Sequence, residues 1–283
     1  MSAFPRTREV PCNLCGAAGY RVVAVLPPYR MVSCASCGFV YLSPRPVDEA
    51  FPELYQDYHP VRMEAPESWG SYMEGIFTFT GVLLDKMLPS KGSVMDVGCG
   101  FGFFVEEMKK RGWKSRGIDL SEAAVAYASK RGLDVEVGTL DTIGLKDGSL
   151  DAVTMFYVLE HVTDPMATLR EITRVLRPGG VLIARVPHTT PIVKLLGLLG
   201  IKNNLYDPPF HLSDFSPATI KMMMEKAGFC EVRTCIGGGT LPVNTAPRLI
   251  SKASTGAAHF LEKISASRIL LPGVSKTTVA IRD

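Results

Sequence analysis

The stretch Ser93-Val-Met-Asp-Val-Gly-Cys-Gly-Phe-Gly102 decides the fold class of this chain. Residues 94–97 are apolar apart from Asp96, as in a buried strand, and the glycines precede an apolar, helix-like run over residues 103–111. A strand, a glycine turn and a helix N-terminus together let the backbone approach a nucleotide-like ligand closely. Because any tight strand-to-helix turn also favours glycine, the remaining sequence has to decide which ligand this turn holds.

Strands and helices alternate regularly beyond this turn. We expect further strands at residues 114–118, 134–137, 150–156, 181–186, 229–236 and 276–282, and helices at residues 70–88, 122–130, 166–175, 217–227 and 247–265. Ser121 and Asp164-Pro165 stand where helix N-caps belong. The alternation predicts an α/β fold, a doubly wound parallel sheet with helices on both faces. Ligands bind such sheets beyond the carboxyl ends of the strands.

Two ligands compete for the glycine turn, a nicotinamide dinucleotide and S-adenosylmethionine. A dinucleotide site favours Gly-x-Gly-x-x-Gly, because its pyrophosphate rests on the helix N-terminus. Here the spacing is Gly-x-Gly-x-Gly, and Asp96 stands just before it, where a carboxylate repels a pyrophosphate. S-adenosylmethionine carries cationic groups and no phosphate, and Asp119 is placed to accept hydrogen bonds from both ribose hydroxyls. The pattern therefore favours S-adenosylmethionine.

Two Cys-x-x-Cys pairs near the N-terminus predict a metal site. Cys12 and Cys15 form the first pair and Cys34 and Cys37 the second, with 18 residues between the pairs. Four thiolates at this spacing suit tetrahedral Zn²⁺ in a zinc ribbon. Because four cysteine ligands leave no open coordination position, we expect the ion to serve structure.

The composition narrows the class of protein further. The chain has 283 residues, of which 46% are hydrophobic and 21% charged, as in an ordinary globular protein. Its net charge of +3 is too small to argue for a nucleic-acid partner. We find no signal-peptide pattern and no apolar stretch long enough to span a bilayer. Paired cysteines without a secretion signal indicate a reducing compartment, so we expect the cytoplasm. The sequence predicts no oligomeric state.

At residues 93–186 the chain resembles the class I S-adenosylmethionine-dependent methyltransferases. The resemblance is carried by Asp96-Val-Gly-Cys-Gly-Phe-Gly102, Gly117-Ile-Asp119, Asp147-Gly-Ser-Leu-Asp151, Val158-Leu-Glu-His-Val162 with Asp164-Pro165, and Leu176-Arg-Pro-Gly-Gly180. It implies a Rossmann-like sheet of seven strands, the last antiparallel and beside the fifth. The cofactor-binding residues that it implies are Asp96, Gly98, Cys99, Gly100, Gly102, Asp119, Leu120, Leu140, Asp141 and Tyr157. Many relatives carry an acid where Thr139 stands, so adenine recognition would rest more on the two residues after it and on the backbone.

The whole chain resembles a narrower subgroup in which a cysteine ribbon and a Pro-Arg-Pro segment precede this domain and a His-Leu-x-x-Phe-Ser segment, here residues 211–216, follows. Related sugar C-methyltransferases are larger and have a further carboxy-terminal domain, so C-methylation of a sugar is an alternative only. The expected domains are a zinc ribbon (1–45), a linker with N-terminal helices (46–92) and a methyltransferase domain (93–283) with substrate-covering insertions at 187–215 and 240–272. In the linker, Tyr55, Tyr58 and His59 either fold over a ligand or pack the linker down.

Three histidines are candidates for the catalytic base. An alcohol acceptor has to lose its proton during methyl transfer, and histidine is the usual base near neutral pH. His188, after the fifth strand, and His211, in the expected substrate loop, are better candidates than His161, which also fits a role in orienting the loop under the cofactor. We therefore predict an O-directed methyltransferase that acts on a small-molecule, glycosyl or lipid-like metabolite.

Other functions stay open from the sequence alone. An RNA methyltransferase would use the ribbon to bind nucleic acid, and clustered basic residues with exposed aromatics there would support it, but Arg21 and Arg30 alone do not. A non-catalytic zinc module would carry a degenerate cofactor fold, which the intact acidic residues and glycines argue against. The apolar segment from Ile192 to Ile201 is compatible with a packed helix, with a lid over a hydrophobic acceptor, or with transient contact with a membrane surface.

Overall fold

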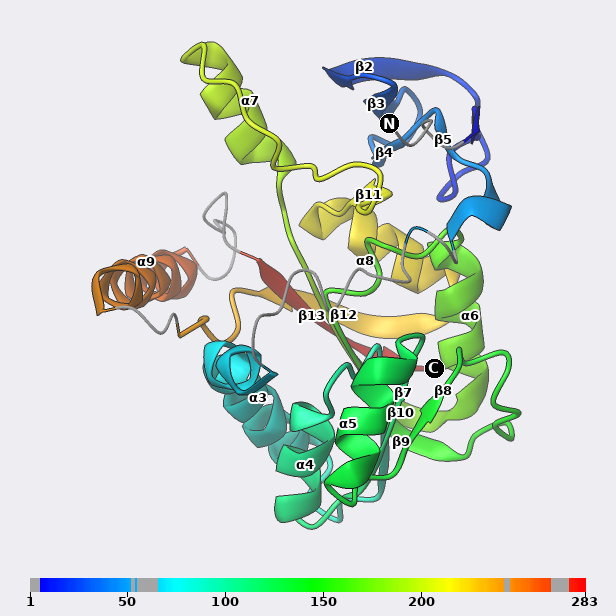
Figure 1. Cartoon of the computed structure of the whole chain (residues 1–283), viewed down its shortest axis with the longest axis vertical. Helices are drawn as coiled ribbons and strands as arrows, with labels where there is room; N and C mark the ends of the chain where they lie inside the picture. The colour runs from blue at the N-terminus through cyan, green and yellow to red at the C-terminus, as the bar shows by residue number, and fades with distance from the viewer. Residues whose placement is uncertain (1–5, 52–53, 55–65, 242–244, 266–274) are drawn as a thin grey trace.

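The computed structural model describes residues 6–51, 54, 66–241, 245–265 and 275–283 (Figure 1). Tyr55, Tyr58 and His59, parts of the predicted linker, lie outside these ranges, as do parts of the predicted insertion at residues 240–272.

A seven-stranded sheet forms the centre of the larger domain, and its strand order is β12-β13-β10-β9-β6-β7-β8. The strands are β6 (Ser93–Val97), β7 (Lys114–Asp119), β8 (Val135–Val137), β9 (Leu150–Phe156), β10 (Leu176–Val186), β12 (Phe229–Cys235) and β13 (Lys276–Arg282). Strands β8, β7, β6, β9 and β10 are parallel, and β13 runs antiparallel between β10 and β12. The prediction of a doubly wound sheet with an antiparallel last strand is confirmed.

Helices cover both faces of this sheet. On one face, α6 (Pro165–Val175) and α8 (Pro217–Lys226) bury Leu169 and Met223 against Val153 and Leu182 of the sheet. On the other face, α3 (Pro66–Met87) and α4 (Phe103–Lys110) pack on the sheet. The helix α5 (Glu122–Lys130) contacts β7 and β8, and α9 (Thr245–Ile264) precedes β13. Burial of these apolar faces is the main source of stability of such a layered fold.

Side-chain caps explain where the helices begin. Ser121 accepts a hydrogen bond from the Ala124 amide, and Asp164 accepts one from the Ala167 amide. Ser216 and Thr219 form a capping box at the start of α8. Each cap satisfies amides that have no partner inside the helix. The sequence predicted the caps at Ser121 and Asp164 from these same residues.

The N-terminal cysteine segment forms a small sheet of order β11-β4-β3-β2. It contains β2 (Tyr20–Leu26), β3 (Tyr29–Cys34) and β4 (Val40–Leu42), and its fourth strand is β11 (Ser213–Asp214), from the segment after β10. The short strands β1 (Thr7–Arg8) and β5 (Arg45–Pro46) pair beside it, and a turn of 3-10 helix, η1 (Asp48–Ala50), follows. The small sheet is therefore completed by a strand from the larger domain.

Side chains also join the cysteine segment to the larger domain. The Asn13 side chain donates to the Asp164 carboxylate and accepts from the Met166 amide, at the start of α6. Lys226 of α8 donates to the Leu14 carbonyl. Buried residues of both parts form one apolar cluster, in which Phe39 lies with its ring centroid 5.3 Å from that of Phe215. The two parts share one hydrophobic core.

The helix α7 (Thr190–Leu198) lies in the apolar segment for which the sequence left a packed helix, a lid and membrane contact open, and it projects away from the body of the molecule (Figure 1). Its first amides, those of Thr189 and Thr190, donate to the carboxylate of Asp214 (2.7 and 2.9 Å). Because this cap is distant in the sequence, local pattern did not reveal it. Leu198, at the end of the helix, is 86% exposed. Within the described ranges, every helix is too short or too polar to cross a membrane.

Candidate functional site

The glycine turn after β6 is tight enough to require glycine. The amides of Gly98 and Cys99 both donate to the carbonyl of Ile118, at 2.8 and 2.9 Å. Gly98 has φ of 72°, and a Cβ added there would lie 2.3 Å from a methyl carbon of Val158. A larger residue would therefore be strained in its backbone and would clash with a neighbouring loop.

Asp119 is fixed at the end of β7 by two backbone amides. One carboxylate oxygen accepts from the Gly100 amide and the other from the Ser121 amide, both at 2.8 Å. These charge-assisted hydrogen bonds hold the carboxylate beside the glycine turn. The arrangement links the turn to the beginning of α5.

Asp96 is a buried carboxyl group at the end of β6. Burial raises its pKa to about 8, opposed by the hydrogen bond that the Thr154 hydroxyl donates at 2.7 Å and assisted by the negative charge of Asp119. Charge in such a place is costly without a compensating cation. The site thus favours a ligand that brings a positive group to Asp96.

A cavity of about 1970 Å³ opens beyond the carboxyl ends of the parallel strands. The predicted cofactor-binding residues among its lining are Asp96, Gly98, Cys99, Gly100, Asp119, Leu120, Leu140, Asp141 and Tyr157. Gly102 is not one of the lining residues. A Cβ added to Gly102 would meet Leu133 at 2.7 Å, so this glycine allows α4 to pack closely on its neighbours.

One wall of the cavity comes from α3 and was not foreseen. Trp69, Tyr72, Met73 and Phe77 of this helix line the cavity. Their helical spacing was visible in the sequence, but an apolar helix face predicts core packing as readily as a ligand wall. Only the position of α3 over the strand ends distinguishes the two.

Tyr157 lines the cavity at the end of β9 and is held there by Arg185. Its φ is 59°, which is uncommon for a residue with a side chain. Its amide donates to the Arg185 carbonyl (2.8 Å), and its hydroxyl accepts from the Arg185 side chain (3.0 Å). Arg185 is itself buried and donates to Thr277 (2.8 Å). These contacts fix the Tyr157 ring at the cavity wall.

The three predicted histidines occupy different environments. His161 and His211 line the cavity, and their ring centroids lie 4.8 Å apart in an edge-to-face arrangement. His188 is not one of the lining residues; burial lowers its pKa, the positive charge of Lys276 acts in the same direction, and the negative charge of Asp214 opposes both. The structure therefore brings together two of the three histidines.

The loop that carries His211 is tied both to the strand ends and to the cysteine segment. The amides of Leu212 and Ser213 donate to the carbonyl of Glu160 (2.7 and 3.2 Å). The Leu212 carbonyl in turn accepts from the Leu42 amide (2.9 Å), and Ser213 pairs with Tyr41. The position of His211 in the cavity thus depends on contacts made by β4.

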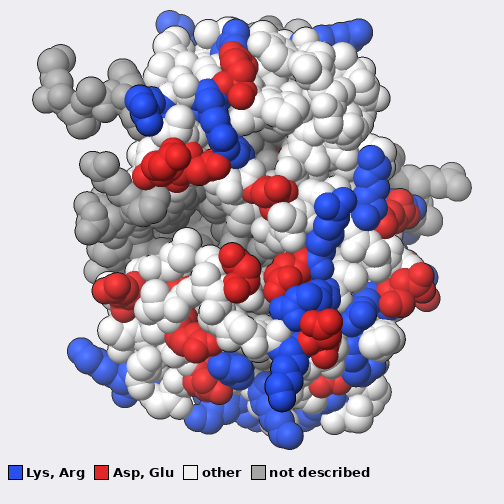
Figure 2. Space-filling model, turned by 90° about the vertical axis from the view of Figure 1, so that its right-hand side faces the viewer, with Lys and Arg blue, Asp and Glu red and all other residues white. Residues whose placement is uncertain are grey.

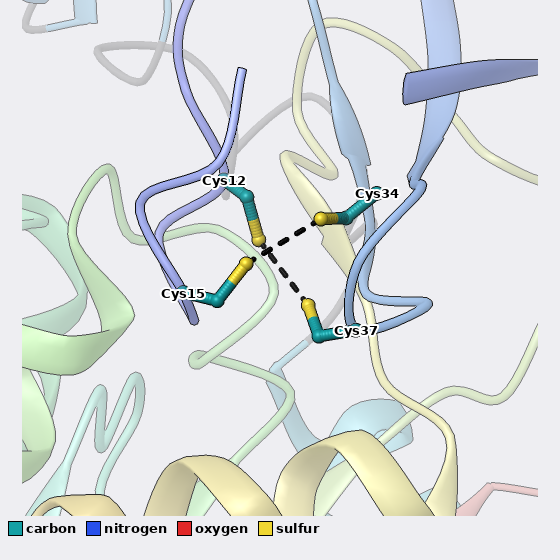
Figure 3. Close-up of side chains that lie close together, drawn as sticks. All are labelled: Cys12, Cys15, Cys34 and Cys37. Carbon is teal, nitrogen blue, oxygen red and sulfur yellow. Dashed lines mark hydrogen bonds between the residues drawn. The ribbon is translucent and has the colours of Figure 1, made fainter. Parts of the chain in front are cut away.

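The four N-terminal cysteines converge on one point (Figure 3). Their sulfur atoms all lie within 4.8 Å of one another, with Cys12 to Cys37 and Cys15 to Cys34 each 3.5 Å apart. Zn–S bonds of about 2.3 Å in a tetrahedron place sulfurs at about 3.8 Å, close to this spacing. The donor set and geometry are those of a structural zinc site.

Comparisons with known proteins agree with this geometry. A family model described as a methyltransferase domain matches residues 95–184. A ubiquinone biosynthesis O-methyltransferase of Xanthomonas axonopodis pv. citri is 33% identical over 154 residues, which are 50% of this chain and 64% of that protein. The chain thus spans less than two thirds of that relative. The Pseudomonas entomophila protein of the same name is 34% identical over 166 residues, 54% of this chain and 71% of that protein.

Solved structures agree in fold. A SAM-dependent methyltransferase of Archaeoglobus fulgidus has a TM-score of 0.52 at 19% identity, covering 76% of this chain and 98% of that one. A phosphoethanolamine N-methyltransferase of Haemonchus contortus in complex with S-adenosyl-L-methionine has a TM-score of 0.51 at 15% identity, covering 86% and 62%. At these identities the likeness concerns the fold alone.

Proposed function

Because this chain belongs to the class I S-adenosylmethionine-dependent methyltransferases, we propose that it transfers the methyl group of S-adenosylmethionine to a hydroxyl oxygen of a small-molecule acceptor. The observation that carries the proposal is the pair of fixed carboxyl groups, Asp96 and Asp119, on either side of the glycine turn in one cavity. When bound, S-adenosylmethionine supplies an electrophilic methyl group. The protein has to hold the cofactor, align the acceptor and remove a proton.

Each end of the cofactor has a candidate partner in the cavity. Two backbone amides hold the carboxylate of Asp119 in one position beside the glycine turn. In this position its oxygens accept hydrogen bonds from the ribose hydroxyls of the cofactor. Asp96 provides a counter-charge for the ammonium group. Leu140 and Asp141 face the adenine, and Tyr157 lies beside the methionine part, next to the acceptor end. Gly98, Cys99, Gly100 and Leu120 complete the surface that the cofactor contacts.

Two observations support a hydroxyl acceptor. His161 and His211 line the same cavity, where a histidine can accept the hydroxyl proton as the methyl group moves. The relatives at 33–34% identity are named as O-methyltransferases. The apolar wall from Trp69, Tyr72 and Phe77 suits an aromatic or lipid-like acceptor and excludes water from the reacting atoms.

We propose the four-cysteine ribbon as a structural zinc module of a cytoplasmic enzyme, in which residues 1–45 support the domain at residues 93–283. Nothing observed favours RNA as the acceptor. On the face shown in Figure 2, basic side chains are most frequent toward the lower right, and acidic side chains lie among them there. A backbone-binding groove for RNA would gather Lys and Arg along one path.

The proposal is tested first by cofactor binding. We expect calorimetry to detect S-adenosylmethionine binding to the wild type and roughly 10- to 100-fold weaker binding to Asp119→Asn, since one charge-assisted contact contributes about 1.5–3 kcal/mol. Asp134→Asn, which changes an exposed carboxylate outside the cavity lining, is the matched control. Wild-type protein that does not bind the cofactor would refute the function.

Acceptor chemistry is tested by transfer. Protein and cofactor carrying a ¹³C-methyl group are incubated with a metabolite extract, and the product is examined by NMR for a methoxy carbon. An N- or C-methyl product would replace the O-directed assignment. We expect His211→Ala or His188→Ala to lower kcat; if neither variant loses turnover, the proposed histidine base is wrong.

A further inference from the structure

Glu160 is a buried acidic residue at the wall of the cavity. Its side chain is 0% exposed, and among the described residues neither carboxylate oxygen has a hydrogen-bond partner. Burial raises its pKa to about 8, partly offset by its own amide and reinforced by the negative charge of Asp214. Leaving such a group without a partner destabilises the folded state. Its position at the cavity wall suggests that a bound ligand satisfies it.

Two imidazoles approach the same point. One potential ligand atom from each of Glu160, His161 and His211 lies within 4.8 Å of the other two. The Nδ1 atom of His161 lies 3.0 Å from the Phe210 carbonyl oxygen, which can only accept a hydrogen bond. Nδ1 therefore donates, and in the neutral ring Nε2 carries the lone pair. An imidazole whose second nitrogen donates to a carbonyl is the usual arrangement of a metal-binding histidine.

We propose that Glu160, His161 and His211 bind a divalent transition-metal ion at the acceptor end of the cavity, separate from the four-cysteine site. Two imidazoles and a carboxylate suit borderline ions such as Zn²⁺, Mn²⁺, Fe²⁺ or Co²⁺ better than Mg²⁺ or Ca²⁺, which favour oxygen ligands alone. Three protein ligands leave coordination positions open toward the cavity. The ligand that fits there is the hydroxyl oxygen of the acceptor.

This site rests on the proposed function only for the identity of the acceptor group. A bound cation lowers the pKa of a coordinated hydroxyl and orients its oxygen. His161 and His211 then act as ligands, and the hydroxyl proton passes to water in the cavity. Because the Glu160 carbonyl holds the Leu212 and Ser213 amides, and Ser213 pairs with Tyr41, the ribbon brings His211 to the other two ligands.

The test is metal binding by the full chain with its cysteine site loaded with Zn²⁺. Mn²⁺ is titrated into the protein and its free concentration is followed by electron paramagnetic resonance, because Mn²⁺ has little preference for thiolates. We expect one Mn²⁺ per wild-type chain, and binding at least about 100-fold weaker in Glu160→Gln and His211→Gln. His259→Ala, which removes an exposed imidazole on α9, should bind Mn²⁺ as the wild type does.

Three outcomes decide the matter. A wild type that binds no Mn²⁺, and no Zn²⁺ or Co²⁺ beyond the cysteine site, overturns the proposal. So does undiminished binding in Glu160→Gln when circular dichroism shows it folded; if that variant does not fold, His211→Gln decides in the same way. Calorimetry with S-adenosylmethionine on the same samples separates the two proposals: cofactor binding without a second ion refutes the metal site alone, and a second ion without cofactor binding refutes the function alone.

Discussion

The proposed cofactor end and the proposed acceptor end of the cavity are built in different ways. At the cofactor end, Asp96, Gly98, Gly100 and Asp119 come from two neighbouring parallel strands and are fixed by each other's amides. At the acceptor end, His161 follows β9, whereas His211 lies in a distant loop that is attached to the ribbon through β11.

One end is therefore positioned by residues that are close in the sequence, and the other by segments that are far apart in the sequence. The cofactor end depends on residues within two strand-turn-helix units, and the sheet positions it. The acceptor end depends on the segment after β9 and on the loop that carries His211, and this loop pairs with β4 of the four-cysteine ribbon. Perturbing the ribbon should therefore affect acceptor binding much more than cofactor binding.

The largest effect is expected from Cys34→Ser. Loss of one ligand removes most of the folding free energy from a structural zinc site, where apparent binding is worth about 10 kcal/mol or more. We expect less than one zinc per chain and increased hydrogen exchange at residues 207–216, with S-adenosylmethionine affinity within a few-fold of wild type. Metal analysis measures the zinc content, and mass spectrometry measures the hydrogen exchange of residues 207–216. Unchanged protection of residues 207–216 would contradict the coupling of ribbon and acceptor loop.

Gly98→Ala tests the cofactor end. The added Cβ would lie 2.3 Å from Val158, and φ would stay at 72°, so strain and overpacking together should cost about 3 kcal/mol in the free energy of unfolding. We also expect weaker cofactor binding with ribbon zinc retained. Gly132→Ala has φ of 73° with no atom within 4 Å of the added Cβ, and it isolates the backbone contribution. Equal losses in the two variants would show that the contact with Val158 is unimportant.

A pH series on Asp96 gives a smaller, graded effect. Burial raises the folded pKa to about 8, so the ligand-free group is largely protonated at neutral pH, whereas a cationic ligand requires the carboxylate. Cofactor affinity should rise by up to about tenfold per pH unit toward pH 8 and then level off. Calorimetry in buffers of different ionisation enthalpy should detect proton release on binding.

Two variants sharpen this pH dependence. Thr154→Val removes the hydroxyl that stabilises the charged form, so the midpoint should move to higher pH. Asp96→Asn should bind the cofactor weakly at every pH. Without ligand, the unfolded state loses this proton above its ordinary pKa of 3.8 while the folded state keeps it to about 8, so stability should decrease as pH rises through that interval. A pH-independent affinity in the wild type would contradict the proposed charge pairing.

The smallest effect is expected from Asn13→Ala. It removes the hydrogen bonds to Asp164 and to the Met166 amide, which are worth about 1–2 kcal/mol together. We expect a modest rise in the KM of the acceptor and no change in zinc content. Asn203→Ala, on the exposed loop after α7, is the control. If Asn13→Ala changed the affinity for S-adenosylmethionine instead of the KM of the acceptor, the ribbon would act on the cofactor end, and the prediction would be wrong.

The sequence predicted the parallel strands, the antiparallel last strand and the cysteine cluster, because each follows from local periodicity, spacing or family likeness. It left a helix at residues 192–201 as one alternative among three, because the cap of α7 is the distant Asp214, and it did not predict the pairing of β11 with β4. Glu160 was visible only as part of a loop segment, since its isolation from hydrogen-bond partners arises from packing. Likewise, His188 and His211 looked alike in the sequence, and only the fold places His211 at the cavity.

The strand that Ser213 and Asp214 contribute to the ribbon has a consequence for protein engineering. A chain cut before residue 46 would lose β4, which pairs with this strand, and Phe39, which covers Phe215. The methyltransferase domain would then expose an open backbone edge and an apolar surface, both of which promote association between chains. If this site is transferred to another scaffold, the ribbon therefore has to be transferred together with it.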